Sequence, residues 1–154
     1  MNISKFTQKS QEVVQGCEKI AMDYGHQEIG EEHLLASMMK VDDSLISKLI
    51  EVFLAQIDGL LNKRPKVTGG DMRIDRYLNE TLIYAEDEAK RMGDEYVSVE
   101  HLFLSLLAHP SKEVKALFKQ CQITKERFLQ VLSQVRGNQR VTSDNPEATY
   151  DTLE

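Results

Sequence analysis

The sequence contains an internal repeat, and this repeat restricts the fold more than any other feature. Segments 10–39 and 78–107 lie sixty-eight residues apart and are identical at eight of thirty aligned positions. Chance would give roughly two identities at ordinary amino-acid usage. The identical pairs are Glu12/Glu80, Glu18/Glu86, Ala21/Ala89, Gly25/Gly93, Glu32/Glu100, His33/His101, Leu34/Leu102 and Ser37/Ser105. The repeat predicts two copies of one structural unit.

Apolar residues recur at helical spacing in both copies, and no stretch of useful length alternates as a strand would. In the first copy the spacing predicts a helix that begins at about Ser4 or Thr7 and ends at Tyr24, and a second helix over 31–40. In the second copy it predicts a helix over 74–92. Gly25 and Gly93 follow the first helix of each copy, where a left-handed residue would end it. The expected fold class is therefore all-α.

The second halves of the two copies differ in length. In the second copy, Ser98, Ser111 and Thr124 are the expected N-caps of three further helices. The first copy lacks seven residues between its matching third and fourth helices. This predicts either one fused helix over 43–62 or a very tight bend, and a dimer that swaps through the fused helix is a further alternative. The fold expected is a pseudo-twofold tandem repeat of two four-helix units, shortened in the first.

Prolines, glycines and polar residues divide the chain into parts. The strongest internal break is the segment 64–73, which reads as a hinge between the copies. Beyond the second copy the sequence becomes polar and unpatterned, as linkers are, so we expect the chain to be the front piece of something longer. The expected parts are the first repeat over 1–63, the hinge over 64–73, the second repeat over 74–137 and a linker over 138–154.

Composition and charge exclude several classes of protein. The 154 residues suffice for one domain with a real core, and 41% hydrophobic with 29% charged residues is typical of a soluble globular protein. A net charge of −6 disfavours nucleic-acid partners. No apolar run approaches the roughly 18–20 residues that cross a bilayer, and no secretion signal is visible. Cys17 and Cys121 are interpreted as reduced core or near-core residues of a cytoplasmic protein.

Two Glu-His pairs invite a metal-site interpretation, which the helix geometry disfavours. Neighbouring helical residues diverge by about 100°, so Glu32 and His33 cannot face one ion, nor can Glu100 and His101. A metal shared by the two histidines would require the copies to face each other there. No HExxH, Walker or GxSxG motif occurs, and neither cysteine has an identifiable base. The chain is expected to be no enzyme and to hold no metal or cofactor.

The helix expected over 74–92 carries apolar residues outside its core stripe. That stripe comprises Ile74, Leu78, Leu82, Ala85, Ala89 and Met92. Tyr77 and Tyr84 lie on a flank about 90° from the stripe, and Ile83 is also off it. These side chains either pack on the other copy or line an apolar groove between the copies, together with Met or Leu of the helix after Ser98. Such a groove would suit a short extended or helical segment of a partner.

Four segments carry motifs of a known family: 6–12, 24–29 and 32–35 in the first copy and 89–102 in the second. Together they closely resemble the N-terminal repeat domain of Clp/Hsp100 AAA+ unfoldases. The hinge over 64–71 and the tail over 137–147 are similar to the ClpB disaggregase branch in particular.

The resemblance implies a domain on a flexible linker ahead of two ATPase rings. The parent protein would be a homohexamer that binds ATP and Mg²⁺ outside this chain, while the isolated domain would be a monomer. The domain would engage unfolded or aggregated proteins. In some branches it would also engage adaptor proteins or a partner chaperone system.

The resemblance also implies a client-binding groove. The positions that match its apolar residues are Leu82, Tyr84 and His101, the last standing where an apolar residue can occur. Thr7, Asp94 and Glu100 match polar positions of the family motif, and Ile83 joins the set as an apolar neighbour. The alternative is an adaptor-docking or regulatory domain, whose charged rim selects the partner and whose binding therefore weakens steeply with salt.

Overall fold

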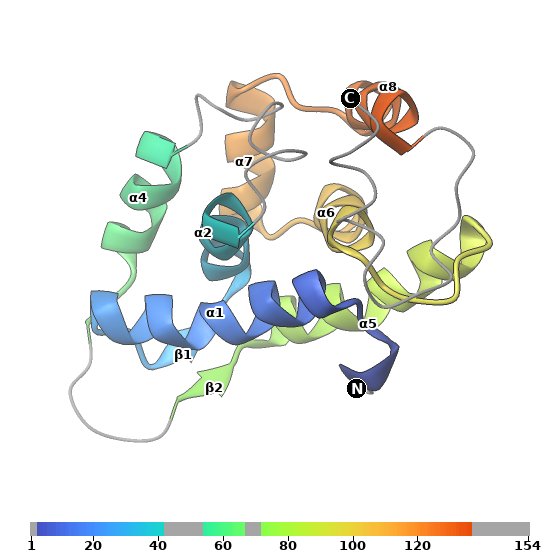
Figure 1. Ribbon diagram of the computed structural model, residues 1–154. Coiled ribbons are helices and arrows are strands. Elements are labelled where there is room, and N and C mark those ends of the chain that lie inside the picture. Colours follow the sequence, from blue (N-terminus) through green and yellow to red (C-terminus); the bar gives the residue numbers. More distant parts are fainter. Residues whose placement is uncertain (1–2, 42–53, 67–71, 137–154) are drawn as a thin grey trace.

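The computed structural model describes residues 3–41, 54–66 and 72–136 of the chain. Its described part is mostly helical, which confirms the all-α expectation (Figure 1). The elements are a 3₁₀ turn (Ile3–Lys5), α1 (Gln8–Tyr24), β1 (Glu28–Ile29), α2 (Glu31–Val41), α4 (Leu54–Lys63), β2 (Arg73–Ile74), α5 (Arg76–Arg91), α6 (Val99–Ala108), α7 (Lys112–Gln120) and α8 (Lys125–Arg136).

Three expectations fall partly or wholly outside the described residues. The predicted fusion over 43–62 concerns a segment of which only α4 is described, so the fused helix, the tight bend and the swapped dimer stay predictions. Residues 67–71 of the expected hinge and the whole expected linker over 138–154 are likewise outside.

Two very short strand pairings join the copies reciprocally. β1 and β2 pair in parallel, with Ile29 opposite Ile74. Phe6 forms an isolated parallel bridge to Val97. Under the sixty-eight-residue offset, position 6 corresponds to 74 and position 29 to 97. The segment before the first helix of each copy therefore pairs with the segment before the second helix of the other, as a pseudo-twofold repeat requires.

Helix termini follow the local sequence signals. Thr7 caps α1 by accepting a hydrogen bond from the Ser10 N–H, and the equivalent Asp75 caps α5 by accepting from the Leu78 N–H at 2.8 Å. Gly25 and Gly93 have φ of 73° and 71°, as expected of left-handed residues that follow a helix.

The expectation that α5 begins at Ile74 is wrong. Asp75 is an extended cap residue, so Ile74 belongs to β2 and is 42% exposed instead of lying in the core stripe.

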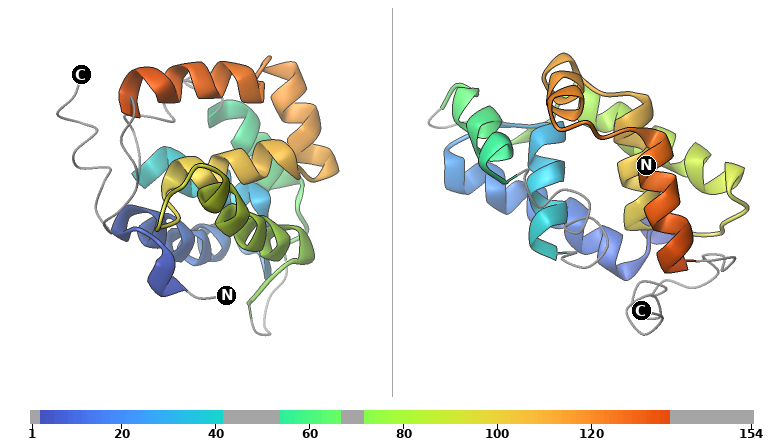
Figure 2. Two further views of the ribbon diagram at one scale, coloured as in Figure 1. Left: turned by 90° about the vertical axis from the view of Figure 1, so that its right-hand side faces the viewer. Right: turned by 90° about the horizontal axis from the view of Figure 1, so that it is seen from above.

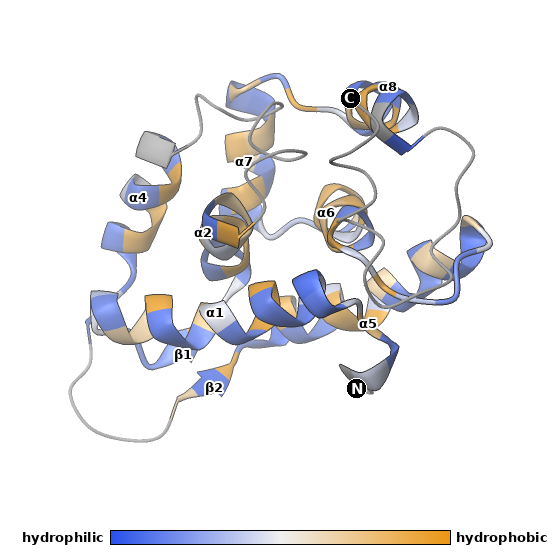
Figure 3. Ribbon diagram, in the orientation of Figure 1, coloured by the Kyte–Doolittle hydropathy of each residue, from blue (hydrophilic) through white to orange (hydrophobic). Residues whose placement is uncertain are grey.

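The most buried helices, α2 and α6, lie at the centre of the fold. Figure 1 shows them nearly end-on, with α1 and α5 crossing beneath, and Figure 3 shows both rich in apolar residues. α1 packs on α2 as α5 packs on α6, while the crossed pairs α1–α6 and α2–α5 hold the copies together. The left view of Figure 2 shows α6 between α5 and α8.

Aromatic rings fill the second copy. The Phe103 ring on α6 lies 5.7 Å from Phe118 on α7 and 4.7 Å from Phe128 on α8, measured between ring centroids. Each fully buried ring is worth about 2 kcal/mol of hydrophobic free energy. These contacts fix α7 and α8 against the central helix.

Candidate functional site

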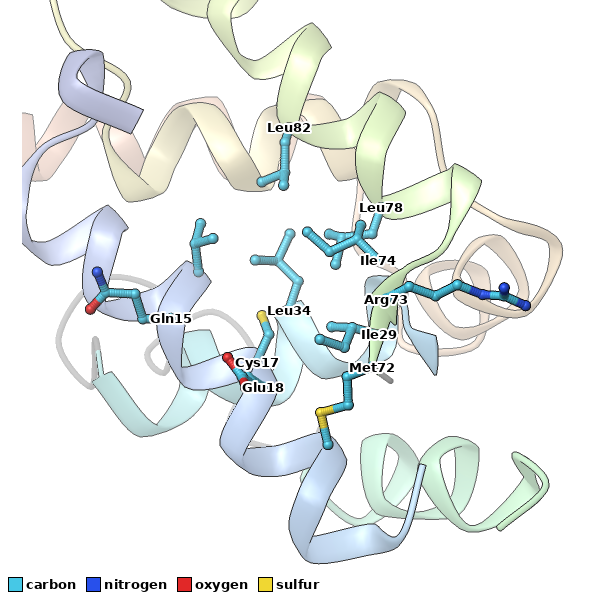
Figure 4. A pocket seen from close by; sticks show the side chains of 11 residues that line it. Gln15, Cys17, Glu18, Ile29, Leu34, Met72, Arg73, Ile74, Leu78 and Leu82 are labelled. Carbon is cyan, nitrogen blue, oxygen red and sulfur yellow. The ribbon is translucent and has the colours of Figure 1, made fainter. Parts of the chain in front are cut away.

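An open apolar groove, with a volume of about 340 Å³, lies between the copies, along α1 and α5. Its lining residues are Val14, Gln15, Cys17, Glu18, Ile29, Leu34, Met72, Arg73, Ile74, Leu78 and Leu82. Figure 4 shows the apolar side chains of α1, α2 and α5 pointing toward one another, whereas Arg73 extends away. The volume falls within the range of small-ligand pockets, so the groove can receive the apolar side chains of a partner.

The groove lining includes one position at which the two copies carry side chains of different size and burial. Val14 and Leu82 are equivalent under the repeat, and both line the groove. Ile74, however, corresponds to Phe6, whose ring is fully buried beside Val97. One side of the repeat therefore carries a buried ring, and the other carries a shorter, partly exposed isoleucine that lines the groove.

Cys17 forms part of the apolar wall of the groove and has no nucleophilic character. Burial raises the pKa of its thiol to about 12, against a smaller opposing effect of the residue's own backbone N–H. The thiol is therefore protonated at neutral pH. The sequence-based interpretation of Cys17 as a reduced core residue is confirmed, and Cys121 is a free, half-buried cysteine.

The predicted apolar residues of α5 lie on two different surfaces. Leu82 is buried and lines the groove. Ile83 and Tyr84 are 47% and 36% exposed and lie outside the groove lining. The Tyr84 ring stacks on His109 with centroids 4.0 Å apart. The groove is also lined by Ile29 and Leu34 of the first copy, not by Met or Leu of α6 as expected.

The predicted polar residues Asp94 and His101 form a buried network. His101 Nδ1 accepts a hydrogen bond from the Ser98 N–H at 2.8 Å, so the proton is on Nε2, which donates to Asp94 Oδ2 at 2.7 Å. Arg136 from the end of α8 also pairs with Asp94. Burial lowers the pKa of His101, while the hydrogen bond that His101 donates to Asp94 opposes that shift.

The other two predicted polar residues are also buried. Thr7 is the cap of α1, and its hydroxyl donates to Ser10 Oγ at 3.0 Å. Glu100 lies in the first turn of α6 with no exposed surface. Of the seven predicted site residues, the structure therefore brings Asp94 and His101 into direct contact and exposes Ile83 and Tyr84.

Sequence reasoning missed the residues that hold the copies together. Glu31 at the start of α2 is almost fully buried and accepts hydrogen bonds from Thr81 Oγ1 and the Ser111 N–H, both at 2.6 Å. Burial raises the pKa of its carboxyl group. The Arg64 side chain bridges Glu32 and Asp75, at 3.0 and 2.8 Å. Nothing in the sequence identified these long-range partners, because they come from segments far from Glu31 and Arg64 in the chain.

Within residues 3–41, 54–66 and 72–136, no group of three or more His, Cys, Asp or Glu side chains is placed to hold a metal ion. His33 and His101 belong to separate networks, because His33 contacts His26 and the Gly30 N–H. No helix in the same described ranges has the length and apolarity needed to cross a membrane.

The family profile of the Clp repeat N-terminal domain matches residues 5–121 and, a second time, residues 73–150. The chain belongs to the Clp repeat N-terminal domain family. The sequence is 38% identical to the chaperone protein ClpB of Nitratidesulfovibrio vulgaris over the whole chain. It is 39% identical to that of Clostridium tetani over 99% of the chain. It spans about a fifth (19%) of the length of these relatives.

Solved Clp repeat domains share the fold of this one. The Hsp104 N-terminal domain from Candida albicans superposes with a TM-score of 0.79 at 20% identity, covering 91% of this chain and 97% of that one. The ClpV N-domain in complex with a VipB peptide superposes with a TM-score of 0.63 at 19% identity, covering 85% and 89%. The chain thus has the fold of these N-terminal domains, and its sequence is similar to ClpB chaperones along its whole length.

Proposed function

We propose that this Clp repeat domain captures exposed apolar segments of unfolded or aggregated proteins for an ATP-dependent disaggregase. The observation that carries the proposal is the open apolar groove between α1 and α5, with Leu82 and Ile74 in its lining. The likeness to ClpB chaperones over the whole chain supports the client class. The ClpV N-domain bound to a VipB peptide supports peptide binding by a domain of this fold.

Capture requires no chemistry in this domain. An apolar client side chain leaves water and enters the groove, a step worth roughly 1.5–3 kcal/mol for one large side chain. Ordering the client segment offsets much of this gain, so the expected affinity is micromolar or weaker. A linker to the ATPase rings of a homohexameric parent, which would bind ATP and Mg²⁺, would then raise the local concentration of client at the rings.

The seven predicted residues divide into contact and supporting roles in this proposal. Leu82 contacts the client inside the groove, and Ile83 with Tyr84 offers a second apolar surface on the outer side of α5. The remaining residues act from beneath the surface, because they are buried in the cap of α1 and around the start of α6; they are Thr7, Asp94, Glu100 and His101.

The test is titration of the domain with an unfolded, fluorescently labelled test protein. Ile74→Ser removes a partly exposed groove residue at little cost to folding, and we expect roughly three- to tenfold weaker binding, because about 1 kcal/mol of apolar contact is lost. Met22→Ser, on an exposed apolar residue of α1 outside the groove lining, is the matched control and should leave the affinity unchanged.

A third variant separates the two apolar surfaces of α5. Tyr84→Ser weakens binding only if the client also uses the outer side of the helix. Unchanged affinity in both the Ile74 and the Tyr84 variant would contradict client capture by either surface.

Docking of an adaptor protein is the second candidate function. The exposed ion pair between Arg73 and Glu28, at 3.5 Å, places charges at β1 and β2 beside the groove. Such charges at the edge of the groove favour docking of an adaptor protein. Binding through such charges would weaken steeply between low and high salt, whereas groove-driven capture would change little. The same titration at two salt concentrations therefore distinguishes the two functions.

A further inference from the structure

A second pocket of about 560 Å³ lies wholly within the second copy, between the end of α6, α7 and the start of α8. We call it the basic pocket and define it by its lining residues Leu107, Ala108, His109, Pro110, Lys115, Phe118, Lys119, Ile123, Thr124 and Lys125. It shares no lining residue with the groove between α1 and α5.

The charge of the basic pocket is opposite to that of the chain. Lys115, Lys119 and Lys125 are exposed, and no carboxylate lines the pocket, although the net charge of the chain is −6. In the part of the chain that the structure describes, none of these three ammonium groups forms an ion pair. The positive end of the α8 dipole, where Thr124 caps the helix, adds to the same field.

The floor of the basic pocket is apolar. Phe118 and Ile123 are buried with 5% and 7% of their surface exposed at the floor, and Leu107 is half-buried beside them. A small inorganic anion would use the lysines and leave this apolar surface in water. A ligand that matches the whole pocket therefore carries negative charges around an apolar group.

We propose that the basic pocket is a second peptide-binding site, which takes an acidic protein segment with an apolar anchor residue. The anchor side chain lies on Phe118 and Ile123, and the flanking carboxylates meet Lys115, Lys119 and Lys125. The site goes beyond the proposed capture of apolar segments, because its selectivity is set by charge. A nucleic acid fits less well, since the net negative charge of the chain repels a long polyanion and the floor is apolar.

The aromatic pair at the rim extends this surface toward α5. His109 lines the basic pocket, and the Tyr84 ring stacks on it. An acidic segment longer than the pocket would therefore meet the outer side of α5, which also carries the exposed Ile83.

The probe is a short fluorescent peptide in which leucines alternate with glutamates. The variant is the triple replacement Lys115→Gln, Lys119→Gln and Lys125→Gln. Because three exposed charge contacts are lost together, we expect about tenfold weaker binding. The matched control is Lys112→Gln, because Lys112 is an exposed lysine of α7 that lines a different pocket. This variant should bind the peptide as tightly as the unmodified domain does.

Two further measurements define the outcome. Raising the salt concentration should weaken peptide binding by the unmodified domain until its affinity approaches that of the triple variant. A peptide with lysine in place of glutamate should bind more weakly than the acidic one. Equal affinity of the parent and the triple variant, or tighter binding of a single-stranded oligonucleotide than of the acidic peptide, would overturn the proposal.

The groove variant Ile74→Ser keeps this test independent of the proposed function. If this variant no longer binds the unfolded test protein but still binds the acidic peptide, two separate sites are supported. If it no longer binds the acidic peptide either, the peptide occupies the groove, and the basic pocket is not its site.

Discussion

The two copies place the same histidine at the same point of a helix but give it different partners. His33 Nδ1 accepts a hydrogen bond from the Gly30 N–H at 2.9 Å, as His101 Nδ1 does from the Ser98 N–H. In both copies the histidine thus does what a glutamate or glutamine does three residues after a cap. The other ring nitrogen of His33 lies 2.9 Å from His26 Nδ1, whereas that of His101 faces a carboxylate.

The two histidines therefore share a structural role in the helix cap but differ in their electrostatic surroundings. The first copy pairs two imidazoles, which are stable together only while at least one is neutral. In the second copy a carboxylate joins the imidazole to Arg136, so one aspartate ties the start of α6 to the end of α8. The repeat therefore preserves the helix cap. The partner of the histidine differs, because equivalent positions of the two copies hold His26 and Asp94, and this residue decides how each copy responds to mutation and pH.

The largest effect is expected at Asp94. Asp94→Ala leaves the guanidinium of Arg136 buried without this carboxylate, so it should lower the free energy of unfolding by about 3–5 kcal/mol. The equivalent His26→Ala removes a neutral ring and should cost roughly half as much. Urea unfolding of both variants measures the comparison, and equal losses would show that the two networks are equivalent in energy.

A pH effect is expected from the buried histidines of both copies, because burial lowers the pKa of His101 as well as those of His33 and His26. Burial, assisted by the nearby positive charge of Arg64, lowers the pKa of His33 to about 4, and burial also lowers the pKa of His26. The unfolded state then binds protons first as the pH falls below about 6.5, so the domain loses stability between that pH and about 4.

The slope contributed by His33 is at most about 1.4 kcal/mol per pH unit, and denaturant unfolding at several pH values measures it. His33→Gln keeps an acceptor for the Gly30 N–H and should flatten the dependence. An unaltered slope in this variant would assign the acid sensitivity to other groups.

A close helix contact distinguishes Gly16 from its equivalent Tyr84. A Cβ atom at position 16 would lie 2.6 Å from Ser37 Oγ, which donates a hydrogen bond to the Val13 carbonyl at 2.6 Å. Gly16→Ala should therefore cost about 1–3 kcal/mol through overpacking of α1 against α2. Tyr84→Ala, at an exposed position, should cost less than about 1 kcal/mol, and thermal unfolding of the two variants compares them.

The smallest effect on stability is expected from making the two short strand pairings alike. Ile74→Phe introduces the residue that occupies the equivalent position 6 and should change the free energy of unfolding by less than about 1 kcal/mol, because the site is partly exposed. If the ring fills the groove, binding of an unfolded test protein should weaken about threefold or more. If the variant still binds the test protein although the ring fills the groove, the client binds at another surface of the domain.

Most helix boundaries could be predicted because their signals are local. The caps Thr7, Ser98, Ser111 and Thr124, together with the two left-handed glycines, lie within a few residues of the backbone groups that they satisfy or turn. Ile74 was misplaced because its helical spacing agreed with the core stripe, while pairing with β1 comes from a segment forty-five residues earlier.

Less of the candidate site could be predicted. Leu82 was identified as a groove residue, and its equivalent Val14 carried a matching apolar signal that the repeat could have supplied. The basic pocket gave no signal, since its three lysines are spread over two helices.

The sequence alone determined the duplication, the helical class and the positions of the caps, because periodicity and capping depend on neighbours a few residues apart. Only the tertiary structure decided which buried polar groups meet. Glu31 binds the second copy, Arg64 bridges Glu32 to Asp75, and Arg136 reaches Asp94. Such partners are chosen by packing, since a charge taken out of water must be paired by whichever donor the folded chain brings within reach.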